Sequence, residues 1–375
     1  MRIPFTEPLK AAYGTRKNLT VMLVEIETDE GITGYGECVG IAVPTQQTII
    51  QTEFKPLLIG EDPMQVEFIS HKLRYTIDWI EFANYAYLGV ETAFFDIKGK
   101  VLNVPLYELF GGLYRDTIEF MGYIHIDEPE INALQARRLV ETGHRTLKVK
   151  VGRDPEEDMI RLEAIRDAVG YDVTMRIDVN MNWSVSTAIR WIKKMEKFKL
   201  QYVEQPVPRG DVRDLAAVSR AVDVPIAADE SIQSLRDALQ LIGHKACEVF
   251  VVYISESGGL VRTRQILDLA NEAGIACVMG TWGEAGVATA AELHLIASSR
   301  NFPFANDSAY EVQADDFITE PLQFQNGRVK VPRGPGLGLE IDRAKVKKYS
   351  EMKDEDTPFR DPDSPRFIPQ AGNIL

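Results

Sequence analysis

The sequence contains little cysteine. Its 375 residues include three cysteines, Cys38, Cys247 and Cys277, which are widely separated along the chain. No two of them have the close spacing that is typical of a metal-binding or redox motif. This scarcity excludes a small disulfide-stabilised scaffold and predicts free thiols in a reducing compartment.

Long hydrophobic runs are also missing. No stretch approaches the roughly 20 apolar residues that a membrane-spanning helix needs. The first residues, Met1-Arg2-Ile3-Pro4, lack the apolar core of a secretory signal. We therefore expect a cytoplasmic protein with no membrane partner.

Positive charge is in deficit. The chain has 42 Lys and Arg residues against 56 Asp and Glu residues, which gives a formal net charge of −14. Nucleic acids and anionic membrane surfaces repel such a chain, so neither is an expected partner. An anionic substrate would have to be attracted locally, by lysines or by a bound cation.

The first part of the chain has the pattern of a small α+β unit. Residues 19–39 alternate like a β-hairpin around the turn Thr28-Asp29-Glu30-Gly31. Helical spacing follows at about 45–57, 64–80 and 86–102, and Gly111-Gly112 ends a short helical turn.

From about residue 117 strand-like and helical segments alternate. The predicted strands cover 118–125, 146–151, 173–178, 200–204, 224–228, 247–253, 275–280 and 302–305. The predicted helices lie near 128–143, 155–169, 184–198, 211–221, 232–243, 258–273 and 284–299. Eight strands separated by seven helices are typical of a closed (β/α) barrel. The glycine fingerprint of an open dinucleotide-binding sheet is missing.

We therefore predict the α/β class, with a TIM-type (β/α) barrel over residues 116–314. Residues 1–115 form an N-terminal α+β unit. Residues 315–375 form a C-terminal segment that ends in an extended tail rich in Asp, Pro and Arg.

The predicted strand 146–151 contains two lysines. Side chains alternate between the two faces of a strand, so Lys148 and Lys150 point to the same side. Two ammonium groups on one face of a buried strand are costly unless opposite charges face them. By itself the pattern is more typical of an edge strand with a solvated face.

Three carboxylates change that interpretation. Asp178, Glu204 and Asp229 each end a predicted strand, and they are 26 and 25 residues apart, one βα unit each. Because the carboxyl ends of barrel strands meet at one mouth, we expect the three acids to lie close together. Clustered carboxylates repel one another unless a cation neutralises them, and an all-oxygen set suits Mg²⁺.

A Mg²⁺ site gives the lysines a chemical reason. Removal of the proton α to a carboxylate leaves a dianionic enediolate, which a divalent cation stabilises. A lysine can be the base only if its pKa is lowered. Burial, the neighbouring ammonium of Lys148 and the field of the metal would all act on Lys150 in that direction.

These motifs resemble the enolase superfamily, in its muconate lactonizing enzyme branch. The resemblance rests on Lys148-Val149-Lys150, Asp178-Val179-Asn180, Glu204-Gln205-Pro206 and Ala228-Asp229-Glu230-Ser231, and it covers nearly the whole chain. It implies a capping domain, formed by the N-terminal region and the C-terminal segment, over a barrel with Mg²⁺ at its mouth. It also implies that Lys150 is the base and Lys148 its electrostatic helper. Such barrels commonly self-associate, so a homo-oligomer is expected.

One position departs from this branch. A second acid/base lysine usually ends the sixth strand, and here Tyr253 occupies that position, before Ser257-Gly258-Gly259. Tyrosine has a reference pKa near that of lysine, so Tyr253 could donate a proton. Alternatively it only shapes the pocket and leaves the chemistry to Lys150. The absence of the second lysine weakens a two-base racemase and favours β-elimination or chemistry on one face.

Other side chains are candidates for the pocket. Trp282, after the seventh strand, resembles an aromatic residue that packs against a substrate cation in some epimerases, although a Trp that only covers the barrel rim is an equal alternative. His125 and Tyr123, at the end of the first strand, could face the pocket. His294, in contrast, lies in a helical pattern and is expected on a helix surface or in packing rather than in catalysis.

The sequence thus predicts a Mg²⁺-dependent enzyme that acts on a small carboxylic, amino or imino acid. The α-carbon is then either re-protonated, as in racemisation or epimerisation, or a β-leaving group is expelled. A cycloisomerase of a dicarboxylic acid and a non-catalytic metal-containing binding protein are the alternatives.

Overall fold

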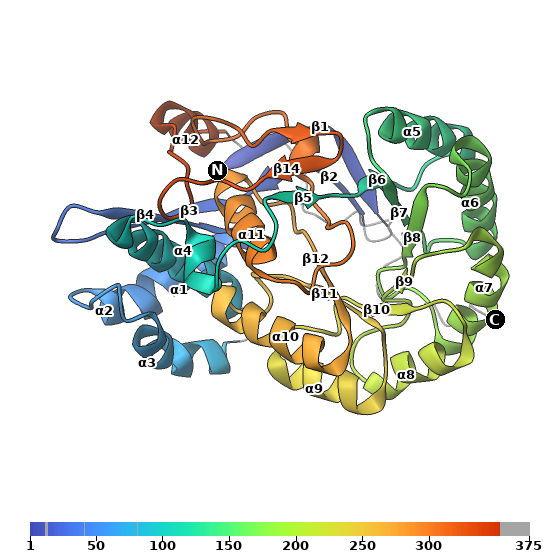
Figure 1. Cartoon of the computed structure of the whole chain (residues 1–375), viewed down its shortest axis with the longest axis horizontal. Helices are drawn as coiled ribbons and strands as arrows, with labels where there is room; N and C mark the ends of the chain where they lie inside the picture. The colour runs from blue at the N-terminus through green and yellow to red at the C-terminus, as the bar shows by residue number, and fades with distance from the viewer. Residues whose placement is uncertain (12–13, 41, 81, 353–375) are drawn as a thin grey trace.

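The computed structural model of this protein describes residues 1–11, 14–40, 42–80 and 82–352 (Figure 1). Its largest sheet has seven parallel strands, and strands that follow one another in the chain are neighbours in the sheet. They are β6 (Gly122–Ile124), β7 (Thr146–Lys150), β8 (Thr174–Asp178), β9 (Val203–Glu204), β10 (Ile226–Ala228), β11 (Val249–Val252) and β12 (Ala276–Met279).

Helices connect these strands along the outside of the sheet. They are α5 (Pro129–Glu141), α6 (Pro155–Val169), α7 (Val185–Met195) with the 3₁₀ turn η3 (Glu196–Phe198), α8 (Val212–Ala221), α9 (Leu235–His244), α10 (Leu260–Ala273) and α11 (Gly286–Ser298). Figure 1 shows them as an arc around the strands, so the predicted βα alternation is confirmed. The local sequence determines where α6 begins. The Asp154 carboxylate caps the helix by accepting hydrogen bonds from the N–H groups of Glu156 and Glu157.

The eighth predicted strand, 302–305, is not a regular strand in the structure. The segment nevertheless joins the two edges of the sheet. The Asp307 N–H donates to the Met279 carbonyl of β12 (2.9 Å), and the Asn306 carbonyl accepts from the N–H of Met121, directly before β6 at the opposite edge (3.0 Å). The proline in this segment has no N–H to give to a ladder. The barrel is therefore closed by hydrogen bonds at the end of the segment.

The first predicted strand, 118–125, is divided in two. Its first half is β5 (Thr117–Glu119), which pairs with β14 (Arg328–Lys330) in a three-stranded sheet completed by β13 (Phe324–Gln325). Its second half is β6, which pairs with β7 in the barrel. The division arises because the chain leaves one sheet and enters another at residues 120–121.

The N-terminal region begins with a hairpin that the sequence pattern does not predict, β1 (Arg2–Ala11) and β2 (Gly14–Thr20). Two prolines and a register shift between Pro4 and Leu9 interrupt the alternation of β1. The predicted hairpin follows as β3 (Met22–Glu27) and β4 (Thr33–Cys38). The helices of the N-terminal region are α1 (Val43–Ile49), the π-helical turn η1 (Ile50–Phe54), α2 (Lys55–Leu58), α3 (Val66–Trp79), α4 (Ala83–Leu102) and the 3₁₀ turn η2 (Leu106–Phe110).

Glycine allows β4 to lie directly on α4. A Cβ atom added to Gly36 would be 1.8 Å from the Gly89 carbonyl oxygen, and one added to Gly34 would be 2.1 Å from that of Ala93. The run Ile32-Thr33-Gly34-Tyr35-Gly36 is therefore a strand whose glycines face a helix backbone at close range.

The C-terminal segment returns to the N-terminal region. After the 3₁₀ turn η4 (Tyr310–Val312), the Ala314 N–H donates to the Pro4 carbonyl (2.9 Å). Helix α12 (Arg343–Ser350) lies beside the N-terminus in Figure 1, and Arg343 pairs with Glu25 of β3. The predicted extended tail lies, from residue 353 onward, outside the described residues. No helix in the described part of the chain is long and apolar enough to span a membrane.

Two buried carboxylates of the N-terminal region accept hydrogen bonds from the first turns of barrel helices. Glu37 of β4 accepts from two N–H groups at the start of α11, at 2.7 and 2.9 Å. Glu91 of α4 accepts from the N–H groups of Leu260 and Val261 at the start of α10. The first N–H groups of a helix have no partner inside the helix and carry partial positive charge. These carboxylates therefore hold the N-terminal region on the barrel.

Substituting Glu37→Gln should change how stability depends on pH. Burial raises the pKa of Glu37 from 4.5 to about 8, so the folded protein binds this proton more tightly than the unfolded chain does. The stability contributed by the protonated group is fully present below about pH 4.5 and is lost as the pH rises through about 8. The Tm of the variant minus that of the wild type should therefore increase over this range. Thermal unfolding at several pH values measures this difference.

The altered hydrogen bonds of the glutamine add an offset that does not depend on pH. Glu30→Gln, in an exposed turn, is the matched control and should show no trend. A difference for Glu37→Gln that stays flat or falls between pH 5 and 8 would contradict the raised pKa.

Candidate active site

Lys148 and Lys150 lie on β7 and point into the barrel. Every side chain of β7 is buried, and Leu147 and Val149 belong to the main hydrophobic core. Parallel pairing puts Lys150 beside Asp178 of β8, and Lys148 beside Arg176. The interior therefore has two layers, with Lys150 toward the mouth and Lys148 one layer deeper, as the period-two alternation requires.

Carboxylates surround both ammonium groups. Lys148 Nζ lies 2.6 Å from Glu204 Oε1, 2.5 Å from Asp307 Oδ2 and 3.3 Å from Asp178 Oδ2. Lys150 Nζ lies 2.5 Å from Asp178 Oδ2. Burial alone would lower the pKa of Lys148, but the charges of Asp307 and Glu204 raise it well above its ordinary value. Lys148 is therefore a fixed ammonium group.

The three predicted metal ligands come together. Asp178 ends β8, Glu204 ends β9 and Asp229 follows β10 directly. One oxygen from each carboxylate lies within 4.8 Å of the others, and all three residues are buried. The strand order explains this convergence, since β8, β9 and β10 are successive neighbours in the sheet.

The crowding of these acids perturbs their ionisation. Burial and the charge of Asp178 raise the pKa of Glu204, and burial together with Glu230 raises that of Asp229. Burial would also raise the pKa of Asp178, but the two lysines lower it. Asp178 is therefore a stable carboxylate, whereas ionisation of Glu204 and Asp229 requires further positive charge.

These residues fit a divalent cation that prefers oxygen ligands. The Oε2 atom of Glu204 is buried and has no hydrogen-bond partner within the described chain, whereas buried carboxylate oxygens normally have one. These three acids, with Asp307 beside Lys148, face the buried cations Lys148, Lys150 and Arg176, so full ionisation would leave negative charge in excess. A cation bound to Asp178, Glu204 and Asp229 would occupy the free oxygen and compensate the charge.

The backbone after two ligand strands is strained. Asn180, Met181 and Gln205 have φ values of +47°, +65° and +32°, which side-chain-bearing residues rarely adopt. The Met181 N–H donates to the Gln205 carbonyl (2.8 Å), which ties the two turns together. The side-chain oxygen of Gln205 accepts from the Asp229 N–H (3.0 Å). These contacts fix the spacing of the three ligand strands.

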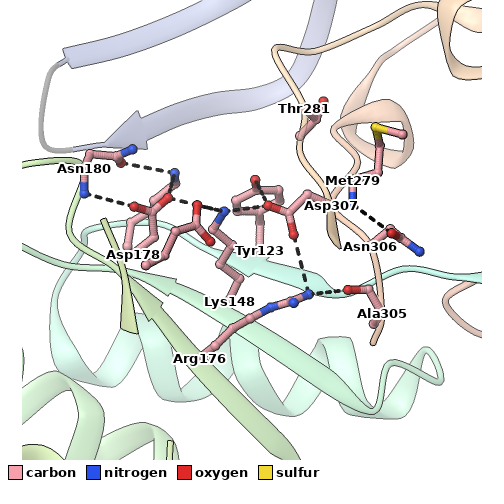
Figure 2. A network of polar contacts seen from close by, with 12 residues as sticks. Tyr123, Lys148, Arg176, Asp178, Asn180, Met279, Thr281, Ala305, Asn306 and Asp307 are labelled. Atoms are coloured by element: carbon pink, nitrogen blue, oxygen red, sulfur yellow. Dashed lines mark hydrogen bonds and ion pairs between the residues drawn. The ribbon is translucent and has the colours of Figure 1, made fainter. Parts of the chain in front are cut away.

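The sequence reasoning missed one acid of the site, Asp307. Figure 2 shows its carboxylate between Lys148 and Arg176, and it also accepts a hydrogen bond from the Tyr123 hydroxyl (3.3 Å). The sequence contained a signal for Asp307, because this residue follows the eighth predicted strand. Asp178, Glu204 and Asp229 lie at the ends of their predicted strands in the same way.

A cavity of about 480 Å³ has Lys150 in its wall, whereas the three predicted metal ligands are not among the described residues that line it. The predicted site residues that line it are Lys150, Tyr123, His125 and Trp282. Leu9 and Arg16 line it from the hairpin β1–β2. The cavity therefore lies between the barrel mouth and the N-terminal region.

Tyr123 and His125 form one wall. Their rings stack with centroids 5.7 Å apart, and the Tyr123 ring centroid is 5.6 Å from the Nζ atoms of both lysines. Burial, with the charge of Lys150, lowers the pKa of His125 to about 4, so its imidazole is neutral at pH 7. His125 Nδ1 lies 3.1 Å from the Lys10 carbonyl oxygen, which assigns the proton to Nδ1 and leaves Nε2 as an acceptor.

Tyr253 lies on the opposite side of the barrel from the lysines. It follows β11, which is four strands away from β7. Its ring is buried 6.3 Å from that of Trp282, but Tyr253 is not among the described residues that line the cavity. Burial and the charge of Asp229 raise the pKa of its hydroxyl well above the ordinary value, so the phenol keeps its proton.

His294 packs inside the fold, as expected. It is buried in α11, and its Nε2 atom lies 3.1 Å from the Leu337 carbonyl oxygen.

Comparison with known proteins gives consistent relatives. Residues 2–111 match the mandelate racemase / muconate lactonizing enzyme N-terminal domain, and residues 132–345 match the enolase C-terminal domain-like family. The chain is 30% identical to the N-succinyl-L-Arg/Lys racemase of Bacillus cereus, over 94% of this chain and 96% of the relative. It is 31% identical to the L-Ala-D/L-Glu epimerase of Bacillus subtilis, over 90% and 93%.

A solved structure shows the same architecture. The 2-chloromuconate cycloisomerase of Rhodococcus opacus 1CP superimposes with a TM-score of 0.89 at 27% identity, covering 93% of this chain and 96% of the other. Since both domain families match and these relatives are all isomerases, the chain belongs to the enolase superfamily, as an enzyme of the muconate lactonizing enzyme type.

Proposed function

We propose that this enzyme uses Lys150 to remove the proton α to the carboxylate of a small carboxylic, amino or imino acid. The observation that carries the proposal is the position of Lys150. It is the one lysine of β7 that lines the cavity, and it lies 2.5 Å from a carboxylate of the candidate metal site. A substrate in the cavity would therefore meet a base and a metal site together.

The cofactor we propose is Mg²⁺, held by Asp178, Glu204 and Asp229. When bound, it stabilises the negative charge that develops on the substrate carboxylate as the proton leaves. Lys148, one layer deeper and held by Glu204 and Asp307, adds a fixed positive charge below the same region. The chain thus supplies one lysine for proton transfer and one for charge.

The fate of the α-carbon depends on Tyr253. A phenol that keeps its proton can donate it from the side opposite Lys150, or it can only shape the pocket. In the first case the substrate is re-protonated on the other face. In the second case expulsion of a β-leaving group, with Lys150 as the single base, is the favoured outcome.

A second candidate function is cycloisomerisation of a dicarboxylic acid. The structural likeness to a chloromuconate cycloisomerase supports it, as does Arg16, a cation that lines the cavity and could face a second carboxylate. The third alternative, a binding protein without activity, is disfavoured because the relatives compared are enzymes and Lys150 is present in the cavity.

We further propose that residues 1–115 and 315–375 act together as a cap over the barrel 116–314. The hydrogen bond from the Leu106 N–H to the Gly336 carbonyl (2.8 Å) and the ion pair of Arg343 with Glu25 support this division. A cytoplasmic location and assembly into a homo-oligomer stay predictions.

Lys150→Ala should abolish exchange of the α-proton. Wild-type enzyme with Mg²⁺ in D₂O should incorporate deuterium at the α-carbon of at least one member of a panel of amino, imino, N-acylamino and dicarboxylic acids. Mass spectrometry measures this incorporation. The loss should be about 10²- to 10⁴-fold or more, the usual contribution of a general base. Lys193→Ala, exposed on α7, is the control. Full exchange in the Lys150→Ala variant would contradict the proposal.

Tyr253→Phe separates the two roles of the phenol. Because Lys150 is the base, deuterium exchange should stay within a few-fold of the wild type. If Tyr253 is the acid, product formation should fall about 10²-fold or more while exchange persists. If it only shapes the pocket, both rates should change together and by less. Loss of exchange itself would show that Lys150 does not abstract the proton alone.

Mg²⁺ should stabilise the wild-type protein through the three carboxylates. A cation that binds only the folded state adds about 2.7 kcal/mol at 100 times its Kd, which raises the Tm. Glu204→Gln removes one charge and should abolish most of this increase in a thermal unfolding experiment. Glu163→Gln, whose carboxylate is exposed, should keep it. Equal increases in both variants would place Mg²⁺ elsewhere.

A further inference from the structure

We infer that Glu256 is a positioning residue, which fixes the indole of Trp282 in the cavity wall and links it to the N-terminal region. Glu256 lies in the tight turn 253–259 that follows β11, and only 4% of it is exposed. The inference builds on the proposed function, because it concerns the wall against which the substrate would lie.

The Glu256 carboxylate receives hydrogen bonds from three separate segments. Its Oε1 atom accepts from the Trp282 indole N–H (2.8 Å), after β12, and from the Tyr85 hydroxyl (3.1 Å), on α4. Its Oε2 atom accepts from the Gln233 side-chain amide (3.2 Å), after β10. An indole N–H can only donate, so only an acceptor at this position satisfies it. Glu256 is therefore the common acceptor of two barrel loops and one N-terminal helix.

The N-terminal region also holds Trp282 at a second point. Arg16 of β2 donates to the Trp282 carbonyl oxygen (2.7 Å). The ring of Tyr85 lies 6.3 Å from the indole, with an interplanar angle of 67°. Gly40 fits over this pair, since an added Cβ atom would be 3.1 Å from Tyr85 and 3.7 Å from Trp282. Trp282 is thus held at its indole nitrogen, at its backbone carbonyl and beside its ring.

A large ring held this firmly determines which substrates fit. Trp282 lines the cavity, so its rotation would change the space available beside Lys150. Without Glu256, the indole N–H and the Tyr85 hydroxyl would lose their shared buried acceptor, and an alternative rotamer of Trp282 could become populated. Glu256 therefore acts on substrate fit through Trp282, without touching the reacting atoms.

The test compares Glu256→Leu with Glu256→Gln, using the acid that shows the fastest deuterium exchange. Leucine removes the acceptor, and we expect KM to rise about tenfold or more while kcat changes by less than about threefold. Glutamine keeps an acceptor for the indole N–H and should restore most of the wild-type KM. Tyr85→Phe removes only the link to α4 and should give an intermediate KM. Glu163→Gln, exposed on α6, is the control.

Fluorescence gives a readout that does not need turnover. Subtracting the emission spectrum of Trp282→Phe from that of the wild type isolates the signal of Trp282. The same subtraction is made between each Glu256 variant and its double variant with Trp282→Phe. The emission spectrum of Trp282 should be altered in Glu256→Leu and close to that of the wild type in Glu256→Gln. If the Leu variant does not fold, Glu256→Ala, which also removes the acceptor of the indole N–H, supplies the same comparison.

The possible outcomes are distinct. Unchanged KM and an unchanged Trp282 spectrum in Glu256→Leu would overturn the inference. So would a fall in kcat at constant KM, because it would place Glu256 in the chemical step. If no acid exchanges with the wild type, the proposed function fails, while the fluorescence comparison still decides the role of Glu256.

Discussion

Charge buried inside the barrel is the constraint on which the rest of this structure depends. Each buried ion loses its hydration, a cost that only a close opposite charge offsets. Lys148 meets this requirement through Glu204 and Asp307, at 2.6 and 2.5 Å, and Lys150 through Asp178, at 2.5 Å. Asp178 and Glu204 come from β8 and β9, and Asp307 comes from the segment that closes the barrel. Lys148 therefore has all its charged partners only when the barrel is closed.

The same geometry separates two chemically identical lysines. They are two residues apart on β7 and point the same way, but they lie in different layers of the interior. In the deeper layer Asp307 lies between Lys148 and Arg176 and pairs with both. In the upper layer Lys150 lines the cavity. Depth and partners, and not residue type, make one lysine a fixed charge and the other a candidate base.

The N-terminal region is tied to the barrel by buried carboxylates on both sides of the interface. Glu37 and Glu91 accept from the first turns of α11 and α10, and Glu256 of the barrel accepts from Tyr85. Glu256 also holds Trp282, which lines the cavity between the two parts. Under the inference drawn for Glu256, stability of the interface and fit of the substrate share this contact.

The sequence by itself determined the features that follow from local periodicity. Alternation along β7 put both lysines on one face, and one acid per βα unit put Asp178, Glu204 and Asp229 at one mouth. It did not determine the hairpin β1–β2 or the broken eighth strand, and although the place of Asp307 after the eighth predicted strand was readable, its pairing with Lys148 was not. Those depend on pairing between segments far apart in the chain, to which local patterns do not respond. Only the tertiary structure brought Asp307 to Lys148, because burial of that ammonium group requires an opposite charge wherever the closed barrel can supply one.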